Sequence, residues 1–172
     1  MDGTKVQGGG NVGPNPGPSW KAVGTGDFYH EGHSGGILWQ NTDGQVAIWE
    51  MNGTHLIGGG TVSVDPGPAW KAIGTGDFYG DGQSDILFQN STNGQVAIWD
   101  MNGTNLIGGG IVSMDPGPSW HAIRTNAGGS DILFQNSTNG QVEIWDMNGT
   151  NIVGGGIIGT NAGPSWKAIG LV

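Results

Sequence analysis

Three carboxylates and a glycine near the middle of the chain have the types and spacing that hold calcium. Asp77, Asp81 and Asp85 stand four residues apart, and Gly82 follows the second of them. A calcium loop needs several oxygen ligands around a tight turn, which regularly spaced acidic residues and a bend glycine supply. We therefore predict Asp77, Asp81 and Asp85 as calcium ligands. The alternative is that these carboxylates accept backbone N–H bonds within the turn, as short acidic side chains commonly do.

Four tryptophans form a second set, and their residue type suits sugar binding. Sugars present apolar C–H faces and many hydroxyls, so their sites combine an aromatic platform with amide and carboxylate partners. The chain has 8 Trp but only 5 Lys and Arg, a balance that suits a neutral glycan. The candidate platforms each follow a Gly-Pro pair: Trp20, Trp70, Trp120 and Trp166. The alternative is that these rings pack in the core, where Trp is usually found.

The sequence offers little evidence for a catalytic site. The segment His30-Glu31-x-His33 offers too few ligands for a transition metal. Ser91 and Ser137 fall in expected turns with no histidine near them in sequence, and there is no nucleophile-elbow motif. The chain has no Cys, which excludes a thiol nucleophile, disulfide bonds and a Cys-ligated zinc. We predict that the protein is not an enzyme.

The tryptophans mark an internal repeat. They are separated by 50, 50 and 46 residues, and the segment that begins at Trp20 returns almost unchanged at Trp70. A fixed period of this length is typical of repeat architectures. The chain is therefore expected to be a single repeat array over residues 1–172. Its parts are a terminal fourth strand at 1–19, three repeats at 20–69, 70–119 and 120–165, and a terminal first strand at 166–172.

Each repeat contains four short strands by its pattern of apolar and turn residues. In the second repeat the strands are expected at 70–76, 85–90, 95–101 and 105–112. Asn-Gly pairs separate the later strands, and this pair favours tight hairpins because both residues tolerate positive φ. No segment has helical periodicity over a useful length. The fold class is all-β.

The third strand of the repeat is apolar on both faces, which indicates that both faces are covered. Ala97, Trp99 and Met101 lie on one face, with Val96 and Ile98 on the other. Four antiparallel strands in a period of ~40–50 residues are typical of β-propeller blades. The alternative is a β-solenoid, whose coils are shorter and lack paired Asn-Gly hairpins. We predict three complete propeller blades with a partial blade at each end.

The two partial blades, one at each end of the chain, affect how a ring of blades could be completed. Residues 1–10 match 101–110, the fourth strand of a repeat, and 166–169 match 70–73, the first strand. Three blades do not close a ring that normally has ~4–8. We therefore expect the chain to be either a fragment of a longer array or a protomer that completes a ring with copies of itself, as a homo-oligomer.

The segment Gly76–Leu87, with the following Gln95–Gly103, resembles the FG-GAP/VCBS-type repeats of bacterial surface proteins and integrin α-subunit propellers. The resemblance implies a propeller fold, a secreted or cell-surface location, roles in adhesion and ligand binding, and often calcium between the first and second strands. Some propellers with such repeats are lectins. In the calcium loop of such repeats the middle ligand is commonly Asn or Asp, but this sequence has Tyr79 at the corresponding position.

The other two repeats are poorer in calcium ligands than the second. The first has Asp27 and Glu31 but no acid at the last position, and the third keeps only Asp131. We expect calcium at the second-repeat loop alone.

Charge narrows the classes of partner. The chain has 5 Lys and Arg against 14 Asp and Glu, a net charge of −9, which repels nucleic acid and anionic membrane surfaces. No signal peptide is recognisable at its start.

Two functions fit these observations. One is a carbohydrate-binding, lectin-like module with repeated sites. The other is a structural or adhesion propeller scaffold, a fragment of a larger surface protein, that has calcium-stabilised loops, takes no small ligand, and binds protein partners or spaces domains.

Overall fold

The fold consists of three four-stranded antiparallel sheets in chain order. The computed structural model describes residues 9–32, 35–123, 129–159, 161 and 163–168. Sheet 1 contains β1 (Trp20–Gly26), β2 (Gly36–Asn41), β3 (Val46–Asn52) and β4 (His55–Thr61). Sheet 2 contains β5 (Trp70–Gly76), β6 (Asp85–Asn90), β7 (Val96–Asn102) and β8 (Asn105–Ile111). Sheet 3 contains β9 (Trp120–Ile123), β10 (Asp131–Asn136), β11 (Val142–Asn148) and β12 (Asn151–Ile157).

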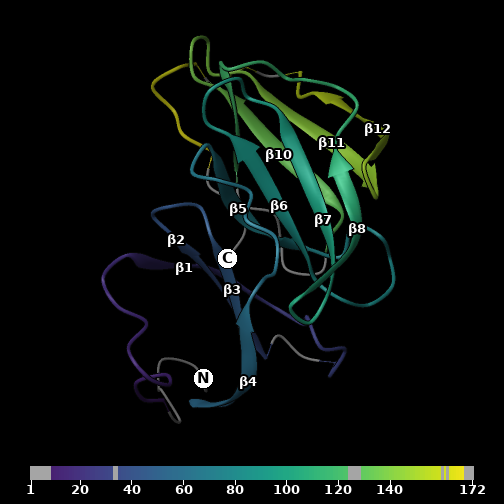
Figure 1. Cartoon of the computed structure of the whole chain (residues 1–172). Helices are drawn as coiled ribbons and strands as arrows, with labels where there is room; N and C mark the ends of the chain where they lie inside the picture. The colour runs from purple at the N-terminus through teal and green to yellow at the C-terminus, as the bar shows by residue number, and fades with distance from the viewer. Residues whose placement is uncertain (1–8, 33–34, 124–128, 160, 162, 169–172) are drawn as a thin grey trace.

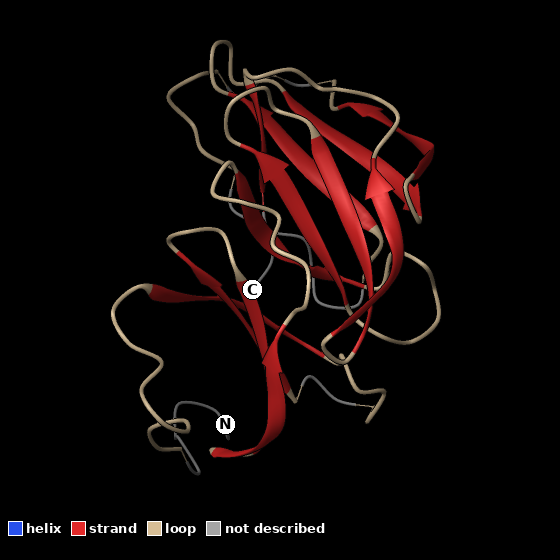
Figure 2. Cartoon of the chain, viewed as in Figure 1, coloured by secondary structure: helices blue, strands red, loops and turns tan. Residues whose placement is uncertain are grey.

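The predicted all-β class and four-stranded repeats are confirmed, and the described residues contain no helix (Figure 2). In the second repeat the first two strands have the predicted bounds, whereas the third begins at Val96 rather than Gln95. Gln95 belongs to the hairpin turn, because its N–H donates to the Asn93 side-chain oxygen at 3.0 Å.

The sheets stack face to face, so that sheet 2 is covered on both sides (Figure 1). We call the surface that carries Leu38, Leu87 and Leu133 the front face of each sheet, and the opposite surface the rear face. Two buried clusters fill the junctions. The first joins the front of sheet 1 to the rear of sheet 2, and the second joins the front of sheet 2 to the rear of sheet 3. The three sheets do not close into a ring.

The Gly-Pro connectors fix how one sheet leads to the next. Each connector passes over the turn glycine between the second and third strands of the sheet before it. A Cβ on Gly94 would meet the Gly117 carbonyl, and Gly94 has a positive φ of 87°. The same close approach recurs between Gly44 and Gly67 and between Gly140 and Gly163. Glycine is therefore required here for space as well as for turn geometry.

A β-bulge accounts for the triple glycine of every outer strand. In sheet 1 the register shifts so that Glu50 pairs with Gly58 and Met51 with Leu56, which leaves Ile57 as the extra residue. Gly59 then takes a φ of 100°, and a Cβ there would strike the Ile48 carbonyl. The same shift and the same obstruction occur on β8 and β12. The triplets are thus a requirement of the bulge.

The partial blades expected at the two ends are only partly covered by the described residues. Residues 1–8 and 169–172 lie outside them. Gly9 and Gly10, at the end of the expected fourth strand, are not in a strand, and neither are residues 166–168. Gly13 lies against the ring of Trp49 and donates its N–H to the Thr54 carbonyl at 3.1 Å.

Candidate functional site

A glutamine near the end of each second strand ties its sheet to the next one. Gln89 donates from Nε2 to the Trp120 carbonyl at 2.8 Å, and its Oε1 accepts the Ala122 N–H at 2.9 Å. The same amide also donates to the Gly94 carbonyl at 3.0 Å. Gln89 is buried, so its bonds form where water does not compete.

The same bridge occurs at all three positions of the repeat. Gln40 bonds Trp70 at 2.8 Å and Ala72 at 3.0 Å in sheet 2. Gln135 bonds Trp166 at 2.7 Å and Ala168 at 2.9 Å. The first two bridges hold the backbone of the next first strand at the front face of the sheet before it, and the third holds residues 166–168, which are not in a strand.

Next to each bridge lies a hollow: two lie between consecutive sheets, and the third lies between sheet 3 and residues 164–168. The three hollows have volumes of about 470, 220 and 360 Å³ in chain order. Equivalent residues line them: the polar end of the second strand (Gln89, Asn90 and Ser91 in the middle hollow) and a basic residue of the first strand (Lys71 there). The repeat therefore produces three similar concave sites, open to solvent and lined by amides, hydroxyls and basic side chains.

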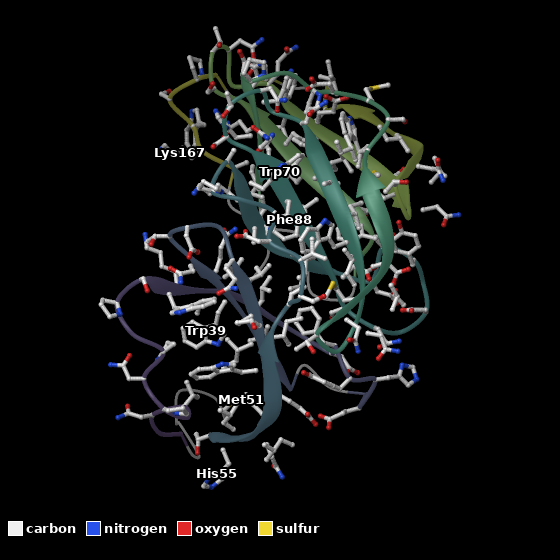
Figure 3. All side chains as sticks on the ribbon, in the orientation of Figure 1. Trp39, Met51, His55, Trp70, Phe88 and Lys167 are labelled. Atoms are coloured by element: carbon white, nitrogen blue, oxygen red, sulfur yellow. The ribbon has the colours of Figure 1, made fainter. Side chains whose placement is uncertain are left out.

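Two of the predicted tryptophan platforms line these hollows. Trp120 lines the middle hollow and also packs against the second buried cluster, and Trp166 lines the third, where it is 68% exposed. Trp70 instead packs against the first buried cluster and lines a separate small hollow with Phe88 (Figure 3). Trp20 is half-buried at the start of β1 and lines none of the described hollows.

The predicted calcium ligands lie in one loop, where their carboxylates accept backbone N–H bonds. Asp77 accepts from Asp81 and Gly82, both at 3.1 Å, and Asp81 accepts from Gln83 at 2.8 Å. Asp81 is exposed and Asp77 is half-buried, whereas Asp85 is fully buried. Within the described residues, no three His, Cys, Asp or Glu side chains are grouped so as to hold a metal. His33, which a His30–His33 pair would need, lies outside the described part of the chain.

Asp85 connects the loop to the interior of sheet 2. Its carboxylate accepts N–H bonds from Phe78 at 2.8 Å, Tyr79 at 3.3 Å and Met101 at 3.2 Å. Burial removes the carboxylate from water and raises the pKa of Asp85 to about 7, although the backbone bonds oppose this shift. The first repeat has Gly36 at this position, and there the Met51 N–H donates to the Gly35 carbonyl instead.

The two tyrosines that stand at the middle calcium position reach the next sheet. The ring of Tyr29 lies against Gly103, and that of Tyr79 lies against Gly149. In each case the hairpin glycine donates its N–H to the preceding phenylalanine carbonyl, at 2.7 Å from Gly103 and 2.6 Å from Gly149. The sequence analysis missed this role. A signal was present, because Phe-Tyr recurs in both loops that precede a further sheet.

Acidic side chains gather beside these tyrosines. Burial raises the pKa of Asp100, and the negative charge of Asp81 adds to the shift. In the first repeat, burial raises the pKa of Glu50, and a hydrogen bond with Glu31 raises it further. Burial likewise raises the pKa of Tyr79, with the charge of Asp100 next in importance. These groups make the tyrosine side of the sheets acidic, in contrast to the hollows with their lysine and histidine side chains.

No protein-family model, curated protein or solved structure matches the chain. The part that the structure describes also contains no helix long and apolar enough to cross a membrane.

Proposed function

We propose that this chain is a non-enzymatic, carbohydrate-binding module of the lectin-like β-propeller kind, whose ring is completed by self-association. The observation that carries the proposal is the threefold repetition of one hollow next to the glutamine bridge. Near-identical sites in one molecule favour binding of repeated ligands, because linked sites gain avidity without any new contact.

The chemistry of the hollows supports a polyhydroxylated neutral ligand. Asn90, Ser91 and their equivalents offer amide and hydroxyl groups, while Trp120 and Trp166 add aromatic surface in two of the hollows. Two of the hollows also fall within the range of roughly 300–1,000 Å³ common for small-molecule sites.

A glycan array probed with the intact chain, followed by calorimetric titration of the best ligands, tests the proposal. We expect binding to neutral, fucosylated or methylated sugars with more than one site per chain. Silence across these sugars would contradict carbohydrate binding.

The second candidate is a structural or adhesion scaffold with calcium-stabilised loops and no small ligand. It is favoured by a row of exposed apolar side chains on the outer strands: Ile57 and Ile107 are each 56% exposed, and Val153 is 65% exposed. Such a row suits contact with a surface protein. An array without sugar binding, combined with a stabilising effect of calcium, would favour this scaffold.

A further inference from the structure

The two junctions inside the chain show what one sheet requires of its neighbour. At both, a front face of leucine, valine and isoleucine meets a rear face of larger side chains, and a glutamine bridges to the incoming first strand. Leu38 and Leu87, on the two covered front faces, are fully buried. Leu133, the equivalent residue on the front face of sheet 3, is only half-buried. Sheet 3 therefore presents a front face of the same kind without a sheet against it among the described residues.

The bridging glutamine of sheet 3 nevertheless has a partner. Gln135 holds Trp166 and Ala168 with two hydrogen bonds, as Gln89 holds Trp120 and Ala122. Trp166 is 68% exposed, because residues 166–168 supply only the first contact that a whole sheet would make. The segment Gly163–Ala168 thus occupies this docking position but leaves the apolar face partly open.

The sequence of that segment identifies a better occupant. Gly163–Ala168 reads Gly-Pro-Ser-Trp-Lys-Ala, and Gly17–Ala22, which leads into β1, has the same six residues. The two segments also share a conformation. Gly17 has a φ of 96° and Gly163 a φ of 90°, and in both the tryptophan N–H donates to the glycine carbonyl, at 3.3 Å for Trp20 and 3.2 Å for Trp166.

The matching surface of sheet 1 also lacks a neighbouring sheet. Among the described residues, no side chain bonds the Trp20 carbonyl or the Ala22 N–H, the two groups that a bridging glutamine holds elsewhere. On the rear face, Ile37 and Trp39 are half-buried, whereas their equivalents Ile86 and Phe88 in sheet 2 are fully buried.

We propose that a second copy of this chain docks sheet 1 on the front face of sheet 3, and that its Gly17–Ala22 replaces Gly163–Ala168 at Gln135. The proposal rests on the self-association part of the proposed function and does not depend on sugar binding. Two such junctions in a head-to-tail pair give a closed ring of six sheets, within the usual range of ~4–8.

The new junction is weaker than the internal ones. Internal junctions include a tyrosine ring on a hairpin glycine, as for Tyr79 and Gly149. The third repeat has no Phe-Tyr pair between its first two strands, and the space around Gly53, the glycine that such a ring would meet, is open. The docked pair also has to displace Gly163–Ala168. We therefore expect a reversible dimer whose population rises with concentration.

Sedimentation equilibrium of the full chain over micromolar to millimolar concentrations tests the docking. The wild-type chain should change reversibly from 17.7 kDa to twice that mass. Leu133→Glu, which places a charge on the apolar front face of sheet 3 and leaves the Gln135 bonds intact, should raise the dimer dissociation constant roughly tenfold or more. Ile107→Glu, on the exposed outer strand of sheet 2, is the matched control and should leave the dissociation constant unchanged.

Two proline substitutions separate the incoming segment from the one that it displaces. Ala22→Pro removes the N–H that the glutamine would accept, on an edge strand where proline is tolerated, and should weaken the dimer. Ala168→Pro removes the same donor from the resident segment and should strengthen the dimer. Cooperative thermal unfolding of each variant checks that the three sheets remain intact.

A mixing experiment gives the decisive result. The Leu133→Glu chain retains a complete incoming segment, and the Ala22→Pro chain retains a complete docking position. Mixed together, they should form a one-to-one dimer although neither forms one alone. A wild-type chain that stays monomeric, variants that dimerise like wild type, or a mixture that does not associate would each overturn the proposal. Sugar binding by the monomeric Leu133→Glu chain is measured separately, and since Leu133 lines none of the described hollows, failure of docking and failure of ligand binding are distinguishable.

Discussion

The ring of Tyr79 lies against Gly149, a residue in the hairpin turn that joins β11 to β12 in the following sheet. Gly149 donates its N–H to the carbonyl of Phe78, the residue before the tyrosine. The loop of one sheet thereby holds the hairpin of the next at the side opposite the glutamine bridge. Each internal junction is therefore held at two separate points, the glutamine bridge and the contact between the tyrosine loop and the hairpin.

Gly149→Ala should destabilise the protein more than the same change at Gly53. Both glycines have a φ near 60°, so each substitution carries the left-handed penalty of about 1 kcal/mol. A Cβ on Gly149 would also strike the Tyr79 ring, whereas the space around Gly53 is open. We expect roughly two to three times the loss at Gly149, measured by urea unfolding. Equal losses at the two positions would show that the ring contact contributes nothing.

Gln89→Leu should disrupt the junction between sheets 2 and 3. Leucine is close in size but leaves the Trp120 carbonyl, the Ala122 N–H and the Gly94 carbonyl without their partner. A loss of about 3 kcal/mol in unfolding free energy is expected. Gln135→Leu, at the more exposed end of the chain, is the comparison variant and should lose less. Similar values for the two variants would contradict the importance of burial.

Asp85 should make stability fall as pH rises from about 4 to about 7. Its pKa is about 7 in the folded protein against 3.8 for the free side chain, so the folded state retains the proton over this interval. Stability contributed by the protonated form is complete below about pH 4 and is lost at up to about 1.4 kcal/mol per pH unit until about pH 7.

Urea unfolding at several pH values compares wild type with Asp85→Asn. The variant should lack this slope. Asp131→Asn, which alters the equivalent exposed residue of sheet 3, is the control and should retain it. A wild-type profile that is flat between pH 4 and 7 would mean that Asp85 is ionised throughout.

His121→Ala should weaken sugar binding, because His121 lines both the second and the third hollow. We expect a drop in the number of tight sites per chain in calorimetric titration, with the remaining sites unchanged. His55→Ala, an exposed position at the start of β4, is the matched control. If both variants bind like wild type, sugar does not bind in the second and third hollows.

Calcium should raise the melting temperature modestly through the second-repeat loop. Each bonded oxygen of Asp77 and Asp81 accepts a single N–H, and a carboxylate oxygen has a second lone pair for a cation. Asp81→Asn should abolish the shift. The measurement compares thermal scans in millimolar calcium and in chelator. Identical melting temperatures of the wild type in the two conditions would contradict calcium binding at this loop.

Local features of the fold followed from the sequence, and long-range contacts did not. The bounds of β5 and β6 could be predicted because tryptophan, glycine and Asn-Gly positions mark them directly. The bridge made by Gln89 could not, since its partners lie 31 and 33 residues further along the chain. A signal existed in the recurrence of glutamine at 40, 89 and 135, on the same face as a buried leucine.

The candidate site likewise could be predicted from the sequence only in part. Residue type pointed to tryptophan platforms, but only the fold shows that Trp70 and Trp120 pack against buried clusters while Trp166 is largely exposed in its hollow. Tyr79 fitted a calcium position poorly in the sequence. In the structure the Tyr79 ring instead contacts a hairpin of the next sheet. The sequence did not predict this contact, because the hairpin is 70 residues away in the chain and its glycine has no side chain that would indicate it.

The glycine bulge on β4, β8 and β12 has a consequence for the direction in which the molecule can grow. A regular outer strand would offer its unpaired N–H and C=O groups to any passing chain and so invite fibres. The bulge twists this border, and the glycines there lack the side chains that a further strand would pack against. Lateral extension is thereby discouraged, and face-to-face stacking is the route left open, a restriction that separates controlled assembly from aggregation.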